Sequence, residues 1–356
     1  HIDMFCIEHD RLPAVERLGN LNIYREIPAI FYNPFSFEYK KYTRDLINRV
    51  SQSNYDILHC HDFRMFFLGC EIKKKIPEIP LIYDSHEYLA GYPYYRRSKK
   101  LSDRLKGFVI WNYYFLKEKK NLYKANKIIT VSNALKDLLI KKSGRPGIVL
   151  RNLPPLTERC QTNCDYWHRN FNVSSDKKII IHTGNAHFST KRQLFLLECI
   201  HEDPRLAMVF LGSNNSLEDI KLTVAKRNFK DIFFHEQVKR SEITYYCSQA
   251  DIGLVYTWNK KWKSYWNALP NKMMDVSLAG IPVLSTEQPE LKNFINEFHH
   301  GITFNGDSKS SLKEGIEKLL HDYEPLKRNA GLIEKQLSWQ LESQKLITLY
   351  NEFFKS

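Results

Sequence analysis

The chain contains 356 residues with a formal net charge of +13, and 43% of the residues are hydrophobic, which is typical of a soluble globular protein. Because a domain ordinarily contains roughly 100–200 residues, this length predicts two domains. No run approaches the roughly 20 apolar residues of a transmembrane helix, and the seven irregularly spaced cysteines argue against a disulfide framework. We therefore expect a cytoplasmic protein with reduced cysteines. Cys160 and Cys164, with His168 nearby, do not have the spacing of a usual zinc site.

Short runs rich in Ile and Val alternate with longer segments of helical period, which is typical of parallel βαβ units. In the first half, these runs predict strands at residues 2–7, 22–27, 56–60, 81–84, 127–131 and 148–151. Ser132 is placed to cap the following helix, and Gly144 is placed to end it. Because His1, rather than Met, directly precedes a strand, we expect that an earlier segment with the first β–α unit is missing.

The positive charge is concentrated in the first half of the chain. Residues 1–155 contain 27 Lys and Arg against 16 Asp and Glu, and residues 92–124, from Tyr92 to Lys124, combine 10 basic with nine aromatic residues. Such interleaving is typical of nucleic-acid-binding segments and of segments that contact anionic membranes. We predict a helix here whose basic face contacts an anionic membrane surface. Its core-packing stripe would consist of Leu101, Leu105, Phe108, Asn112, Phe115 and Leu116.

A second series of strands follows a polar segment. Residues 152–175 contain two consecutive prolines and few apolar residues, so we predict a linker there. Beyond it, we predict strands at residues 179–182, 207–211, 232–235, 252–256, 282–285 and 302–304, and residues 337–354 have helical period. The predicted fold class is α/β, with two doubly wound, Rossmann-like domains.

Polar residues and glycines directly follow several of the predicted strands. In open α/β sheets, ligands lie outside the carboxyl ends of the strands, so these residues are expected to line binding sites. They include His61, Asp62, Ser85, His86, Gly184, Asn185 and Gly212.

The most informative stretch is residues 264–285, SYWNALPNKMMDVSLAGIPVLS. Pro270 and Asn271 begin an amphipathic helix, and the unpaired backbone N–H groups of a helix N-terminus attract phosphate. Lys272 adds a full positive charge. Asp275, one turn further, can accept hydrogen bonds from sugar hydroxyls. Together these features predict a nucleotide diphosphate site.

Several motifs occur in a characteristic order along nearly the whole chain: DILHCHD, IYDSHEYLAG, KIITVSNALKDLL, HTGN, QADIGLVY and ALPNKMMDVSLAGIPVL. The ordered set resembles the GT-B glycosyltransferases of family 4, a retaining group that includes many bacterial polysaccharide and lipid-linked sugar transferases. The resemblance implies two Rossmann-like domains that face each other across a cleft. It also implies sugar transfer from a nucleotide diphosphate sugar to a glycan or lipid-linked acceptor, in cell-surface polysaccharide or glycoconjugate synthesis.

The resemblance also assigns a role to each domain. Residues 1–155 would bind the acceptor, residues 156–334 would bind the nucleotide sugar, and the helix in 335–356 would pack back towards the first domain. His86 matches the active-site histidine of the family, with Glu87 as a candidate orienting partner and His61 as a supporting residue. A histidine that only caps a turn is the alternative interpretation of His86.

In the second domain, the family places a basic pair opposite the leaving diphosphate, and Lys191 and Arg192 match this pair. Gly184 and Asn185 precede it, and Asn185 stands where many relatives have Arg. Further donor residues are implied in two loops. Leu269, Pro270, Asn271 and Lys272 would bind the diphosphate, Asp275 the ribose, Asn267 the donor sugar in place of the usual glutamate, and Gln237 and Val238, next to Glu236, the base.

Transferases of the GT-B type generally need no metal, so we expect no cofactor and no resident metal ion. Three alternatives remain open on the sequence. The substitutions Asn185 and Asn267 would also fit a GT-B-shaped binding protein without turnover, and a GT-B sugar-nucleotide epimerase would share the shape. The segment at 92–124 would also fit a nucleic-acid binder, but we expect a nucleotide-sugar donor as partner and no nucleic acid.

Overall fold

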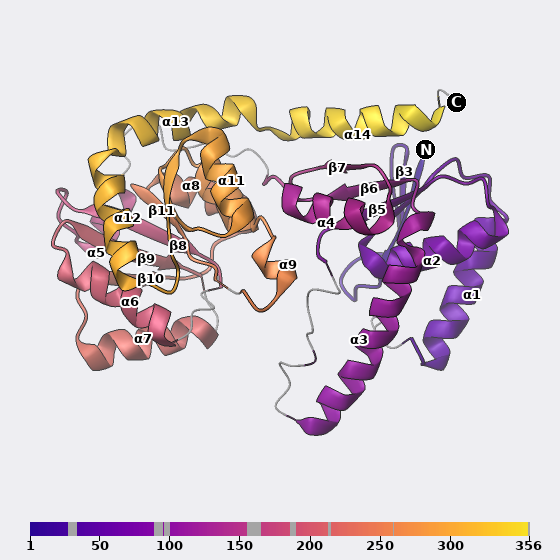
Figure 1. The fold of residues 1–356 in the computed structure, drawn as a ribbon, viewed down its shortest axis with the longest axis horizontal. Coiled ribbons are helices and arrows are strands. Elements are labelled where there is room, and N and C mark those ends of the chain that lie inside the picture. Colours follow the sequence, from indigo (N-terminus) through magenta and orange to yellow (C-terminus); the bar gives the residue numbers. More distant parts are fainter. Residues whose placement is uncertain are drawn as a thin grey trace. The chain divides into compact units, whose positions relative to one another are not determined.

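The computed structural model describes residues 1–27, 34–88, 95, 100–154, 165–185, 190–212, 215–258 and 260–354. The chain folds into two compact units (Figure 1). One consists of His1–Ile129 with Leu139–Gly147, and the other of Thr130–Leu138 with Ile148–Ser356.

Most of the first unit is built on a four-stranded sheet in the order β4-β5-β6-β7. Its central strand β5 is completely buried, and α2 packs against both β4 and β5. The strands are β4 (Leu58–His61), β5 (Leu81–Ser85), β6 (Lys127–Thr130) and β7 (Gly147–Val149). The helices are α1 (Phe37–Ser51), α2 (Asp62–Lys75), α3 (Leu101–Asn121), η3 (Leu122–Lys124) and α4 (Asn133–Ser143), of which the first half is grouped with the other unit.

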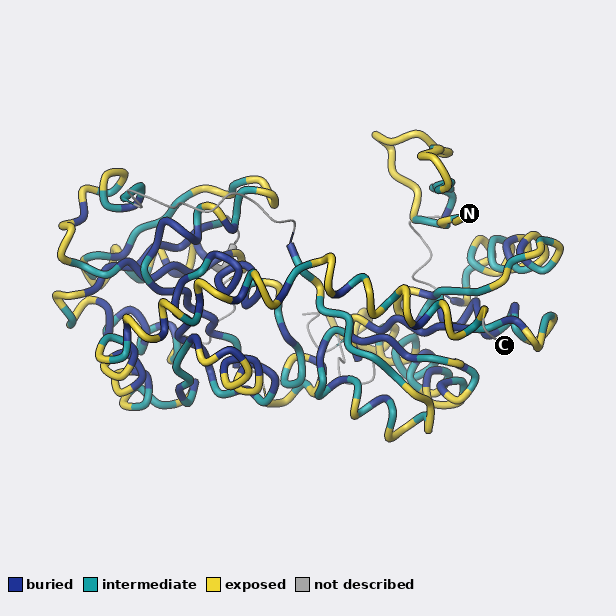
Figure 2. Tube along the Cα trace, turned by 90° about the horizontal axis from the view of Figure 1, so that it is seen from above, coloured by how far each residue is buried: buried dark blue, intermediate teal, exposed yellow. Residues whose placement is uncertain are grey.

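A small separate sheet precedes α1. It has the order β1-β3-β2, with β1 (Ile2–Ile7) parallel to β3 (Leu21–Ile27) and β2 (Val15–Leu18) antiparallel to it. Most of its residues are exposed or half-buried (Figure 2). Strand β2 was not predicted, because its exposed residues carry little apolar signal. The two-residue turn at Gly19, which has φ +59°, is a hairpin feature that could have indicated it.

The second unit contains a six-stranded sheet in the order β10-β9-β8-β11-β12-β13, and its strand pairs are parallel. The order corresponds to that of a doubly wound Rossmann sheet, which reverses between its first and fourth strands. The strands are β8 (Lys178–Thr183), β9 (Leu206–Leu211), β10 (Ile232–His235), β11 (Ile252–Val255), β12 (Val283–Thr286) and β13 (Gly301–Phe304).

Helices cover both faces of this sheet (Figure 1). Ile179 and Ile181 belong to one buried cluster and Ile180 to the other, as expected when alternate side chains of a strand point to opposite faces. The helices that belong to the second unit, whether or not they cover the sheet, are α5 (Tyr166–Phe171), α6 (Thr190–Glu202), α7 (Asn215–Arg227), η4 (Arg240–Glu242), α8 (Ile243–Ser248), α9 (Lys263–Trp266), α10 (Asn271–Leu278), α11 (Pro289–Phe298), α12 (Lys309–His321), α13 (Tyr323–Gln336) and α14 (Trp339–Phe354).

Most of the predicted elements are present. All twelve predicted strands are found, with ends that differ by two residues or fewer. Ser132 accepts a hydrogen bond from the backbone N–H of Leu135 at 3.2 Å, which confirms the predicted cap of α4. Gly144, with φ +66°, directly follows the end of that helix.

Two local predictions were wrong. The predicted linker contains α5, because Trp167 is fully buried in the core of the second unit and its Nε1 donates to Tyr246 O at 3.0 Å. The remainder of that linker, residues 155–164, lies outside the described residues and includes Cys160 and Cys164.

The apolar stripe predicted to pack on the core also differs from the structure. Four of its members on α3 are exposed, and the buried side chains of this helix are instead Tyr114 and Glu118. Glu118 accepts a hydrogen bond from the buried Tyr83 hydroxyl at 3.0 Å. The exposed members are Leu101, Leu105, Phe108 and Leu116. Residues 92–94 and 96–99 of the basic segment lie outside the described residues.

Candidate functional site

The switch point of the second sheet lies between β8 and β11, where the strand order reverses. His182, near the end of β8, is 1% exposed, and its Nδ1 lies 3.2 Å from Leu254 O on β11. Gly184 follows β8 with φ +65°. A Cβ atom at Gly212 would lie 3.4 Å from the Cα atom of Gly184, so the two turns approach each other closely. This is the position at which doubly wound sheets bind ligands.

Helix α10 begins beside this switch point. Its N-cap is Pro270, which supplies no side-chain hydrogen bond, and the first N–H groups of a helix have no intrahelical acceptors. The Lys272 Nζ atom donates to Asn185 O at 2.9 Å and lies 3.3 Å from His182 Nε2. The structure therefore brings together three of the predicted donor residues, Gly184, Asn185 and Lys272.

Burial and the proximity of the two side chains determine the protonation states of His182 and Lys272. Burial lowers the pKa of His182 well below its usual range, and Lys272 lowers it further. A neutral imidazole with its proton on Nδ1 would donate to Leu254 O and accept from Lys272 through Nε2. Burial also lowers the pKa of Lys272 to about 8. At neutral pH the lysine is therefore still mostly a cation, and the partners to which it hydrogen-bonds are neutral.

Asp275 lies one turn further along α10 and is 4% exposed. Its Oδ1 atom accepts a hydrogen bond from Arg240 Nη1 at 2.7 Å. Burial raises the pKa of Asp275, although Arg240 and Lys272 favour the ionised form. Sequence analysis missed Arg240, which lies in η4 beyond the loop after β10. The rule that ligand residues follow strand ends could have found it.

The other predicted donor residues lie around α10. The Asn267 side chain caps α9 by donating to Lys263 O at 2.8 Å, and Asn271 Oδ1 accepts a hydrogen bond from Asn152 at 3.1 Å. Leu269 is buried in the core, and Val238 packs against the same core. Gln237 precedes Val238 in the loop that leads to Arg240.

The predicted basic pair, Lys191 and Arg192, contacts residues outside the cluster at α10. Arg192 binds Asp307 Oδ1 through Nη2 at 2.7 Å and donates to Trp258 O at 2.9 Å. The Lys191 Nζ atom lies 5.3 Å from the Phe195 ring centroid. In the part of the chain that the structure describes, neither side chain contacts Lys272 or Asp275.

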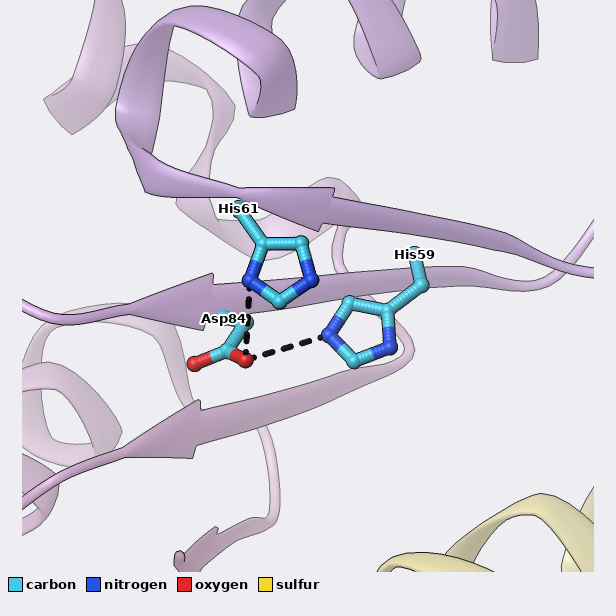
Figure 3. Close-up of side chains that lie close together, drawn as sticks. All are labelled: His59, His61 and Asp84. Carbon is cyan, nitrogen blue, oxygen red and sulfur yellow. Dashed lines mark hydrogen bonds and ion pairs between the residues drawn. The ribbon is translucent and has the colours of Figure 1, made fainter. Parts of the chain in front are cut away.

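The first unit contains a second cluster at the carboxyl ends of β4 and β5. Asp84 on β5 is 4% exposed, and its Oδ2 atom lies 3.2 Å from His59 Nε2 and 3.3 Å from His61 Nδ1 (Figure 3). Its other oxygen lies 3.4 Å from the Nε2 atom of His86. One buried carboxylate therefore holds three imidazoles.

Asp84 is a hydrogen-bonding partner of His86, and the charge of Glu87 also acts on this imidazole. The hydrogen bond from His86 to Asp84 raises the pKa of His86, although burial opposes this shift. Burial acts to raise the pKa of Asp84, but its hydrogen bonds with His59 and His86 bring that pKa well below its usual range. The sequence could have pointed to His59, because residues two apart on a strand share one face of the sheet.

Two family models match consecutive parts of the chain. The model described as Glycosyltransferase Family 4 matches residues 1–152, and the model described as Glycosyl transferases group 1 matches residues 165–336. The chain is a family 4-like glycosyltransferase of the GT-B fold. This result confirms the resemblance found in the motifs, and with it the predicted fold class and enzyme class.

Similar proteins include an uncharacterised glycosyltransferase of Methanocaldococcus jannaschii, which is 20% identical over 98% of this chain and 89% of its own length. Among solved structures, the sucrose-phosphate synthase of Thermosynechococcus elongatus has a TM-score of 0.73 at 17% identity and covers 100% of this glycosyltransferase and 89% of that chain. HepE of Anabaena, in complex with UDP and glucose, has a TM-score of 0.67 at 13% identity, with 93% and 86% covered. At these identities, the structural matches establish the fold.

No helix among the described residues of this glycosyltransferase is long and apolar enough to cross a membrane. The described cysteines, Cys6, Cys60, Cys70, Cys199 and Cys247, are free thiols.

Proposed function

We propose that this glycosyltransferase transfers a sugar from a nucleotide diphosphate sugar and binds the diphosphate at the N-terminus of α10. The observation that supports this most directly is the position of Lys272. Its cation lies at a helix N-terminus beside the switch point, and its hydrogen-bonding partners, His182 and the Asn185 carbonyl, are neutral. An anion placed there would meet both the lysine and the first N–H groups of the helix. HepE, which shares the fold, was solved with UDP and with UDP-glucose.

The remaining donor contacts follow from the residues around α10. The Asp275 carboxylate would accept hydrogen bonds from the ribose hydroxyls, and Arg240 would keep that carboxylate ionised and oriented. Backbone groups at Gln237 and Val238 would meet the base, and Asn267 would lie towards the donor sugar. Gly184 leaves room for the diphosphate because it has no side chain. In this proposal Lys191 is a second cation for the leaving group, and Arg192 supports it from its ion pair with Asp307.

We propose that transfer proceeds with retention and without a metal ion. As the bond between the sugar and the diphosphate breaks, negative charge develops on the phosphate oxygens, and Lys272 and the helix N-terminus would stabilise it. The diphosphate would in turn accept the proton of the incoming hydroxyl. His86, held by Asp84, would donate a hydrogen bond to the sugar as charge redistributes.

The acceptor is proposed to be a glycan or a lipid-linked glycan at the cytoplasmic face of a membrane. The exposed side chains of α3 support this proposal, because Leu101, Leu105 and Phe108 alternate with basic residues on the exposed first half of the helix. A helix of this kind can insert its apolar side chains between lipids while its cations meet anionic headgroups.

Activity is tested by incubating the protein with UDP-, GDP- and ADP-sugars and acceptor extracts, and by measuring nucleoside diphosphate release together with incorporation of the sugar into a glycoside. Formation of both products supports the proposal. Release of free sugar in place of a glycoside would identify an epimerase or a hydrolase, and binding of the donor without any release would identify a binding protein.

Membrane binding is tested by sedimentation with anionic and with neutral vesicles. We expect binding to anionic vesicles only, weakened by salt and by the double substitution of Leu105→Ser with Phe108→Ser. Leu222→Ser, at an exposed leucine of α7, is the control. Preference for oligonucleotides over vesicles would favour the nucleic-acid alternative instead.

A further inference from the structure

We propose that His59, His61 and Asp84 form a binding site for a divalent transition-metal ion in the first unit. The three side chains come from two neighbouring parallel strands, and Figure 3 shows both imidazoles directed towards the carboxylate. These residues belong to the first unit, whereas α10, to which we assign the donor, belongs to the second, and the proposed transfer step requires no ion at Asp84.

The framework of the site is a pair of hydrogen-bonded parallel strands, β4 and β5. His59 and His61 alternate on β4, so their side chains share one face of the sheet, and their rings stack with centroids 4.5 Å apart. Asp84 is the register partner of His61 on β5. Because all three side chains project from paired strands, an ion would find its ligands already gathered and would need little reorganisation of the backbone.

The distances suit a small tetrahedral ion. His59 Nε2 and His61 Nδ1 lie 3.2 and 3.3 Å from the same carboxylate oxygen, and the candidate ligand atoms lie within 4.8 Å of one another. The ligands of a tetrahedral ion bound at about 2.0–2.1 Å are separated by roughly 3.3–3.4 Å. Two of the three ligand–ligand distances are therefore already close to those of a bound ion, and the third, between the two imidazole nitrogens, lies within 4.8 Å and would shorten as the imidazoles rotate.

The donor set indicates which ions would bind. Two imidazoles and one carboxylate are ligands for zinc and related transition metals, whereas magnesium and calcium prefer sites built from oxygen atoms. The carboxylate is buried but the His61 side chain is 58% exposed, so an ion could enter from solvent. Three protein ligands leave the fourth position for water, as in open zinc sites.

The ion would compete with His86 for Asp84. His86 Nε2 lies 3.4 Å from Asp84 Oδ1, and a cation on the carboxylate would neutralise the charge that holds this imidazole. Bound metal would therefore inhibit sugar transfer rather than support it. This consequence rests on the proposed role of His86, whereas binding of the ion does not.

Binding is tested on the whole 356-residue chain, stripped of metal, by titration with Co²⁺, followed by visible absorption, and with Zn²⁺, followed by calorimetry. We expect one site with tetrahedral Co²⁺ bands that Zn²⁺ abolishes. His61→Ala should weaken Zn²⁺ binding by at least about 10-fold, and Asp84→Asn should do the same. Because Asp84 is buried, Asp84→Asn could misfold. The result for His61→Ala, at a half-exposed side chain, therefore decides whether the site exists. His321→Ala, at an exposed histidine of α12, should bind as the wild type does.

Unchanged Zn²⁺ affinity in His61→Ala, or the absence of a Co²⁺ spectrum in the wild type, would overturn the site. A second measurement tests separately whether bound metal inhibits sugar transfer. Zn²⁺ should inhibit transfer by the wild-type protein reversibly with EDTA, and His61→Ala should resist this inhibition relative to its own metal-free rate. If Zn²⁺ binds through His61 but does not inhibit sugar transfer, the metal site is confirmed and the proposed competition with His86 is rejected.

Discussion

The two clusters place opposite charges at the carboxyl ends of parallel strands. In the second unit the charged group beside the switch point is a cation, Lys272, whose hydrogen-bonding partners are the imidazole of His182 and a backbone carbonyl. In the first unit it is a carboxylate, Asp84, which is surrounded by three imidazoles. The cation has neutral hydrogen-bonding partners, and the carboxylate that favours its charge, Asp275, is itself bonded to Arg240, whereas the anion is bonded directly to imidazoles.

This difference indicates what each cluster can do. A partly desolvated cation at a helix N-terminus gains most when an anion arrives, so the α10 cluster is suited to bind a diphosphate. A buried carboxylate that orients imidazoles is suited to hold His86 in a fixed position or to accept a metal ion. Similar sheet geometry therefore serves two kinds of chemistry, which differ in the charge of the group beside the strand ends, Lys272 in one unit and Asp84 in the other.

The largest expected effect comes from the first unit. His86→Ala should lower kcat/KM for transfer by about 10²–10⁴-fold, the usual contribution of a group that assists proton movement. The binding of UDP should be unchanged, because the donor residues lie in the second unit. Since the His86 side chain is 48% exposed, Tm should change little. Steady-state kinetics measure the change in kcat/KM and thermal unfolding measures the change in Tm, with His321→Ala as the control. A full rate of turnover in His86→Ala would remove His86 from the mechanism.

Lys272→Met should lower kcat by about 10²–10³-fold, as expected for the loss of one group that stabilises developing charge. Unlike His86→Ala, it should also weaken UDP binding. Because burial opposes the charge on Lys272, Met in its place should leave Tm equal to or above that of the wild type. UDP calorimetry and thermal unfolding measure both effects, and Lys292→Met on the exposed side of α11 is the matched control. Equal UDP affinity in Lys272→Met and wild type would refute the α10 site.

Much of the fold was predictable because its signals are local. The buried strands are Ile- and Val-rich runs, and a strand covered on both faces is apolar throughout. The residues after β8 and the start of α10 were also predictable, because strand ends and helix caps have sequence features of their own. In the same way, Ser132 and Gly144 mark the two ends of α4.

The missed features depend on contacts between distant segments. Arg240 meets Asp275, and His59 meets Asp84, across 35 and 25 positions of sequence, and no periodicity encodes such pairs. Lys191 and Arg192 are adjacent in sequence, yet Arg192 binds Asp307. On α3, aromatic residues occur all round the helix, so spacing alone did not identify Tyr114 and Glu118 as the buried side.

Arg240→Ala tests how strongly the α10 cluster depends on its ion pair. The substitution would leave the buried Asp275 carboxylate without its guanidinium partner, which should cost about 1–3 kcal/mol of unfolding free energy. The binding of UDP should weaken as well, because Asp275 would lose its orientation. Arg240→Lys should recover part of both losses. Arg227→Ala, at an exposed arginine of α7, is the control. Denaturant unfolding that gives equal stability for Arg240→Ala and Arg227→Ala would contradict the structural role.

The smallest expected effect is a proton taken up when UDP binds. Burial lowers the pKa of Lys272 to about 8, and a bound diphosphate would raise that pKa by favouring the ammonium form. At pH values between the free and bound pKa, the complex holds more protons than its separate parts, so binding should take up a fraction of one proton and weaken as pH rises. Well below pH 8 the lysine is charged in both states and contributes no uptake.

Calorimetry in two buffers with different ionisation enthalpies, at about pH 8.5, measures this uptake. The phosphates of UDP are fully ionised there, so they contribute no proton of their own. Lys272→Met should lose the uptake, whereas His86→Ala should keep it, because the two clusters act on different charges. Equal proton uptake by the wild type and Lys272→Met would assign the proton to another group and would separate the lysine from the diphosphate.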